Sequence, residues 1–81
     1  MEKSLYTRQQ KKLQSLLRQI RLEAGLSQTT LAQKLCQPQS FISKYESGER
    51  RLDLIELKQV CSALGVILKN FIERFEADET Q

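Results

Sequence analysis

The 81-residue sequence has no histidine and no tryptophan, and only two cysteines, three glycines and one proline. A closed zinc site needs about four Cys or His ligands, so Cys36 and Cys61 are too few to form one. Two interpretations of these cysteines stay open: a disulfide between them, or two reduced thiols in a cytosolic protein, which we favour. We expect no metal and no cofactor.

Long hydrophobic runs are also missing. No apolar stretch approaches the roughly 18 residues of a membrane-spanning helix, and the N-terminus has no signal-peptide pattern. Without histidine, a Gly-rich phosphate loop or a carboxylate pair in a cleft, the sequence offers no group to which a reaction can be assigned. It therefore predicts a cytoplasmic protein that is not an enzyme and does not bind membranes.

Charge is distributed unevenly along the chain, although the net charge is only +3. Residues 1–52 carry ten basic and four acidic side chains, whereas residues 53–81 carry three basic and six acidic ones. A basic surface attracts polyanions such as nucleic acids. We therefore expect the first part of the chain to contact double-stranded DNA and the second part to face away from it.

Capping and stop signals divide the chain into five helical stretches, and no alternating run suggests a strand. The predicted fold class is all-α, with five helices in one small domain. Thr7 and Gln10 form a capping-box pattern, which predicts a first helix over residues 8–24. We expect residues 1–7 to be a flexible N-terminal arm, residues 8–76 to be the domain and residues 77–81 to be an acidic tail.

Two short helices are predicted in the middle of the chain, between Gly25 and Gly48. Ser27 is a suitable N-cap for the first of them. Pro38 disfavours a helical residue before it and suits the first helical position, so the second is predicted over residues 38–47. Two short helices joined by a tight turn are typical of a helix-turn-helix, which places its second helix in the DNA major groove.

Two more helices complete the prediction. Asp53 and Glu56 form a second capping box, ahead of a helix that Gly65 closes. The last helix carries apolar side chains at helical spacing. These are Leu68, Phe71, Ile72 and Phe75.

The helix predicted over residues 38–47 carries side chains suited to base edges. If Ile42, Tyr45 and Glu46 face inward, the opposite face presents four polar residues. These are Gln39, Ser40, Ser43 and Lys44. Gln pairs with adenine, Ser bonds to several bases, and Lys approaches guanine or a phosphate. A solvated helix face is the alternative, and the helix-turn-helix context favours DNA contact.

Phe41 lies at the border between the two faces of that helix. It fits two positions: contact with a thymine methyl group, or packing beside Tyr45, which we favour. Just beyond the helix, Arg50 and Arg51 form a basic cluster. Beside a DNA-contacting helix, we expect these two residues to hold backbone phosphates.

The chain resembles the lambda-repressor-like family of bacterial and phage regulators, also called the Cro/repressor or xenobiotic-response-element family. The resemblance covers about residues 13–75. The residues that carry it are Arg21, Gly25, Leu26, Ser27, Gln28, Leu31, Ala32, Leu35, Gln39, Ser40, Ile42, Ser43, Glu46, Gly48, Leu64, Gly65 and Val66. It implies a five-helix fold that binds a short operator, usually as a dimer, and controls transcription without a cofactor.

The resemblance also implies roles for individual residues. Base contacts are expected from Gln39, Ser40 and Lys44, and phosphate contacts from Gln28 and Ser43. An ion pair between Arg21 and Glu46 is expected to orient the DNA-contacting helix.

Two departures from the family pattern bear on the fold. Cys36 stands where the family commonly has glycine, and a left-handed conformation there costs roughly 1 kcal/mol or more. Ile67 stands where the family often has a polar cap. Ile67 either forms a dimer patch with Phe71 and Phe75 or extends the core.

Taken together, these features predict a sequence-specific DNA-binding transcriptional regulator, and specifically a repressor that binds a palindromic operator as a homodimer. Two alternatives stay open. One is an antitoxin that binds its own operator and holds a toxin partner. The other, from a different class, is a helical adaptor that binds only protein.

Overall fold

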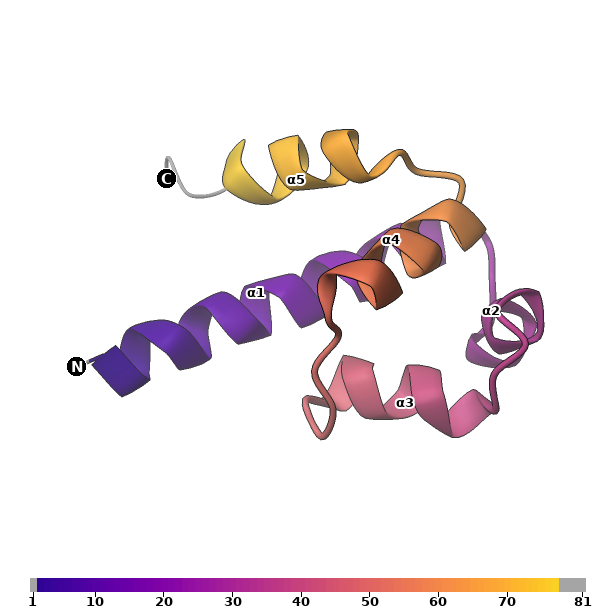
Figure 1. Ribbon diagram of the computed structural model, residues 1–81, viewed down its shortest axis with the longest axis horizontal. Helices are drawn as coiled ribbons and strands as arrows, with labels where there is room; N and C mark the ends of the chain where they lie inside the picture. The colour runs from indigo at the N-terminus through magenta and orange to yellow at the C-terminus, as the bar shows by residue number, and fades with distance from the viewer. Residues whose placement is uncertain (1, 78–81) are drawn as a thin grey trace.

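The computed structural model describes residues 2–77. Within them it contains five helices and no strand, so the predicted all-α fold is confirmed. The helices are α1 (Glu2–Glu23), α2 (Gln28–Lys34), α3 (Gln39–Ser47), α4 (Leu54–Ala63) and α5 (Leu68–Ala77). The long α1 runs through the middle of the molecule, with α5 along one side and α2 and α3 on the other (Figure 1). In this part of the chain, no helix combines the length and apolarity required to cross a bilayer.

The first helix begins earlier than the sequence predicted. It starts at Glu2 rather than at Arg8, so Thr7 and Gln10 lie inside the helix and do not cap it. The preceding residues include Glu and Lys, and the following ones Gln and Lys, all of which favour helix. The predicted helix start is therefore wrong, and the backbone before Arg8 is helical where an arm was expected. Residues 78–81 of the predicted tail lie outside the described part of the chain.

Local capping sets the other helix starts. The Ser27 hydroxyl accepts a hydrogen bond from the Thr30 backbone N–H at 3.0 Å, where α2 begins. Asp53 and Glu56 form the predicted capping box at the start of α4. Pro38 is the N-cap of α3 and not its first helical residue, because its ψ of 154° is extended. The third helix thus starts one residue later than predicted.

The turn between α2 and α3 contains the expected left-handed residue. Cys36 has a φ of 56°, a conformation that costs roughly 1 kcal/mol or more for a residue with a Cβ. Its thiol is exposed, that of Cys61 is buried, and both are free. The disulfide interpretation is therefore wrong. Burial raises the pKa of the Cys61 thiol to about 11, which keeps it protonated as a core group.

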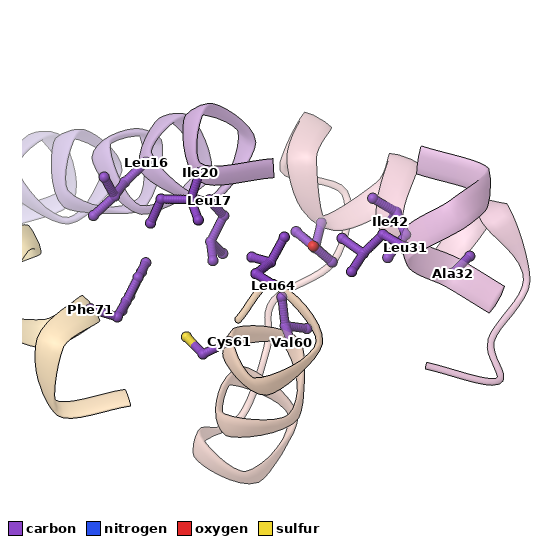
Figure 2. Close-up of a cluster of buried hydrophobic side chains, with 11 residues drawn as sticks. Leu16, Leu17, Ile20, Leu31, Ala32, Ile42, Val60, Cys61, Leu64 and Phe71 are labelled. Carbon is purple, nitrogen blue, oxygen red and sulfur yellow. The ribbon is translucent and has the colours of Figure 1, made fainter. Parts of the chain in front are cut away.

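All five helices contribute to one hydrophobic core. Its buried side chains are Leu16, Leu17, Ile20, Leu31, Ala32, Ile42, Tyr45, Val60, Cys61, Leu64 and Phe71. Figure 2 shows Phe71 of α5 on the same side of the core as Leu16 and Leu17 of α1. Burial of these apolar side chains is the main force that holds the short helices together.

The predicted dimer patch needs correction at one residue. Phe71 is only 1% exposed, because its ring fills the space between α1 and α5, so it belongs to the core and not to a surface patch. Phe75 is half-buried and lies beneath the ammonium group of Lys12, 4.8 Å from the ring centroid. Ile67 is 68% exposed.

Candidate nucleic-acid interface

The helix α3 has one buried face and one polar face. Ile42 and Tyr45 are buried, and the side chain of Glu46 is only 5% exposed. The opposite face carries residues three or four positions apart, which we call the polar stripe. It consists of exposed Gln39, Ser40 and Lys44 and half-buried Ser43. The side predicted to contact DNA is therefore not covered by the described part of the chain.

An ion pair between Arg21 of α1 and Glu46 of α3 holds this helix in place. The Arg21 Nε donates to Glu46 Oε2 at 2.7 Å, and Nη2 donates to Oε1 at 3.0 Å. The third guanidinium nitrogen, Nη1, donates to the Leu26 carbonyl at 2.9 Å. The hydrogen bond to Glu46 raises the pKa of Arg21, despite the opposing effect of burial. The structure thus contains the ion pair expected from the sequence.

The same carboxylate orients two glutamine side chains. The Gln28 Nε2 donates to Glu46 Oε1 at 2.9 Å, and the Gln39 Nε2 donates to Gln28 Oε1. Because a carboxylate only accepts, Gln28 turns its nitrogen toward Glu46 and its oxygen toward Gln39. Gln39 is left with its Oε1 and one N–H for an external partner. We call these four residues, including Arg21, the glutamine chain.

The sequence did not predict the bond between Gln28 and Gln39. The two residues are 11 positions apart and lie on different helices. Each is the first residue of its helix, α2 and α3, which face each other across the turn. A matched pair of amides at these two positions is the signal that would have indicated the contact.

The Phe41 ring packs beside Tyr45, which was the position that we favoured from the sequence. The ring centroids are 5.6 Å apart in an edge-on arrangement, and the Arg50 guanidinium lies 4.7 Å from the Phe41 centroid. The Tyr45 hydroxyl is buried and has no hydrogen-bond partner among the described residues. Burial raises the pKa of this hydroxyl, which therefore stays neutral.

Arg50 makes contacts that sequence reasoning missed. Its guanidinium donates to Glu56 Oε1 at 3.0 Å and to Oε2 at 2.7 Å, and also to the Arg51 carbonyl. The hydrogen bond from Arg50 is the main reason why the pKa of Glu56 falls to about 2. A phosphate contact by Arg50 would compete with this carboxylate. Arg51 is exposed beside the C-terminal end of α3.

Comparison with known proteins identifies the family. Residues 17–67 match a family model described as Helix-turn-helix. The solved structure of an XRE-family like protein from Pseudomonas syringae pv. tomato str. DC3000 is 38% identical, with a TM-score of 0.88 over 94% of this chain and 93% of that chain. The chain belongs to the lambda-repressor-like (XRE) helix-turn-helix family. The resemblance found in the sequence is thereby confirmed.

Two further solved structures share this fold. The wild-type restriction-modification controller protein C.Esp1396I is 27% identical, with a TM-score of 0.82 over 90% of this chain and 96% of that chain. The clp gene regulator ClgR from Corynebacterium glutamicum, at 23% identity and a TM-score of 0.76 over 86% of this chain and 74% of that chain, shows the fold alone. No curated protein sequence matches this chain. As a member of the XRE family, the chain is a DNA-binding transcription regulator.

Proposed function

We propose that this regulator is a sequence-specific repressor whose polar stripe contacts operator bases in the major groove. The observation that carries the proposal is the glutamine chain. It holds the amide of Gln39 at the exposed N-terminal end of α3, with one acceptor and one N–H available. The Gln39 oxygen can accept a hydrogen bond from the N6 amine of adenine, and the remaining N–H can donate one to adenine N7. Ser40 and Lys44 contact neighbouring bases.

Backbone phosphates are proposed to bind around the stripe. Gln28 begins α2, where free backbone N–H groups and the positive helix end favour an anion. Its amide keeps a second N–H beyond the one given to Glu46. Ser43 and Arg51 supply further contacts that fix the position of the protein without selecting a sequence, and Arg50 joins them by exchanging the Glu56 carboxylate for a phosphate.

We propose that two copies bind together through an apolar surface of α4. Leu54 is 65% exposed and Ile55 is 62% exposed. Both lie one helical turn before Lys58, which lines a groove of about 380 Å³ together with the exposed Ile67. A two-fold dimer covers the same surface on both copies and sets two α3 helices about 34 Å apart, in successive major grooves.

The dimer is tested by the molar mass in solution. Ile55→Asp places a charge in the proposed contact and is expected to give a monomer by sedimentation equilibrium at concentrations where the wild type is a dimer. Ile72→Asp, which changes a less exposed apolar residue on α5, serves as the control and is expected to stay dimeric. Equal masses for both variants would contradict the surface assignment.

The function is tested by selecting bound duplexes from a random library. We expect a palindromic consensus with adenine at one position of each half-site. Gln39→Ala is expected to lose the adenine preference and to weaken binding by about 1–3 kcal/mol. Gln33→Ala, which changes an exposed glutamine on α2, is the control and is expected to leave the base preference and the affinity unchanged. If the wild-type protein enriches no sequence from the library, the proposal is rejected.

No contact within residues 2–77 favours the antitoxin or the adaptor, and nothing supports a toxin partner.

A further inference from the structure

A polar cleft lies between α1 and the C-terminal end of α3. It has a volume of about 300 Å³, and its side-chain lining comes from both helices and the segment after α3. The lining side chains are Thr7, Gln10, Lys11, Gln14, Ser47 and Arg51. Two of them are cationic, the others are neutral hydrogen-bonding groups, and none is acidic. This composition suits a phosphate group, which needs positive charge and several donors.

The cleft continues the polar stripe. Ser47 lies three residues after Lys44 and four after Ser43, so it shares their face of α3. The α1 side chains that line the cleft also share one face, because they are spaced at i, i+3, i+4 and i+7. The Gln14 amide lies against the backbone at Gly48, since a Cβ there would lie 2.9 Å from its nitrogen.

The surroundings of Lys11 in the cleft differ from those of two arginines near α3. Arg21 and Arg50 each face a carboxylate at 2.7 Å. By contrast, Lys11 is exposed and makes no ion pair with the side chains that the structure describes. Its ammonium group is therefore available to an anion from outside the chain.

The dimensions of α3 relate the cleft to DNA. Its nine residues span roughly 13 Å at 1.5 Å per residue, close to the ~12 Å width of the major groove. When the polar stripe faces the bases, groups at the end of α3 meet the phosphate backbone that borders the groove. We infer that the cleft binds one backbone phosphate, with Lys11 and Arg51 supplying charge and Gln14 a hydrogen bond. This inference rests on the proposed function and adds α1 to the DNA-contacting surface.

The test is the salt dependence of DNA binding by the full chain. Lys11→Ala is expected to lower the slope of log K against log salt concentration by about 0.9. It should weaken binding to the selected operator and to a scrambled duplex by the same factor, and leave the consensus unchanged. Lys69→Ala removes the same charge from the exposed surface of α5 and is expected to keep the wild-type slope.

A neutral variant separates hydrogen bonding from charge. Gln14→Ala is expected to weaken both duplexes equally without changing the slope. A slope for Lys11→Ala equal to that of Lys69→Ala, or a changed base preference, would overturn the inference while the wild-type consensus still supports the proposed function. Failure of the wild type to select any consensus would reject the proposed function itself.

Inorganic phosphate, titrated at constant ionic strength, distinguishes a DNA phosphate site from a site for free anions. We expect it to compete with the operator for the wild type and to compete less for Lys11→Ala. Saturable phosphate binding in the cleft with no loss of operator affinity would overturn the inference, because the cleft would then lie away from the DNA.

Discussion

Two bidentate Arg–Glu pairs hold the C-terminal end of α1, one on each side of it. Arg21 pairs with Glu46 of α3 at 2.7 Å, and Glu23 pairs with Arg74 of α5 at 2.9 Å. The groups and distances are alike, but the side chains of the first pair are 8% and 5% exposed and those of the second 43% and 49%. Burial makes the loss of one partner costly, whereas water and salt screen an exposed pair. Loss of one partner from the α3 pair should therefore cost more stability than loss of one from the α5 pair.

Removal of the buried arginine tests this comparison most severely. Arg21→Ala strands the Glu46 carboxylate and is expected to lower the free energy of unfolding by about 3 kcal/mol. Urea denaturation measures the change. Arg18→Ala removes an exposed arginine from the same helix and is expected to change it by less than about 0.5 kcal/mol. Similar losses for both variants would show that burial does not distinguish the pairs.

A smaller effect is expected beside the buried pair, at Tyr45. Its hydroxyl is buried without a partner, so the protein has lost the hydration of this group and gained no hydrogen bond. Tyr45→Phe is expected to raise the free energy of unfolding by about 1 kcal/mol, measured by urea denaturation. Destabilisation by Tyr45→Phe would reveal a hydrogen bond to this hydroxyl.

The pair of Arg50 and Glu56 lies between the two extremes, with side chains 38% and 28% exposed. The hydrogen bond from Arg50 lowers the pKa of Glu56 from 4.5 to about 2. Since the folded pKa lies below the unfolded one, the pair stabilises the fold above about pH 4.5, and this contribution is lost as the pH falls toward 2. The stability difference between wild type and Glu56→Gln is expected to shrink over that range in acid-dependent unfolding curves. A constant difference would contradict the lowered pKa.

The smallest effect is expected for the exposed pair. Arg74→Ala should lower the free energy of unfolding by less than about 0.5 kcal/mol, and 1 M salt should reduce even this difference. Glu23→Ala removes the same ion pair together with an exposed hydrogen bond from Gln19, so its effect should be equally small or slightly larger. If Arg74→Ala lowered the free energy of unfolding as much as Arg21→Ala does, the buried and the exposed pair would not differ as proposed.

Much of the fold was predictable because its signals are local. The Ser27 cap, the capping box of Asp53 and Glu56, and the left-handed Gly48 each act within a few residues, and each marks a helix end in the structure. The start of α1 was not predicted, because strong helix formers extend that helix without a capping signal. The inward face of α3 followed from helical spacing alone.

Contacts between helices were harder to predict. Spacing placed Phe71 on an apolar face but did not show that this residue is buried while Ile67 stays exposed. The contact between Gln28 and Glu46 depends on how α2 and α3 cross. Arg50 and Glu56 are only six residues apart, but the conformation of the segment between them decides whether they meet. The pair of Arg21 and Glu46 was expected only because the chain resembles a family that contains it.

The charge of Glu46 has one more consequence for the amides that it orients. With a neutral amide in its place, as in Glu46→Gln, both glutamines could rotate by half a turn and exchange oxygen for nitrogen while keeping their mutual hydrogen bond. The Gln39 amide would then present its oxygen and nitrogen to a base in either of two arrangements. A single buried negative charge removes this ambiguity, so each copy of the protein presents the same atoms to its target.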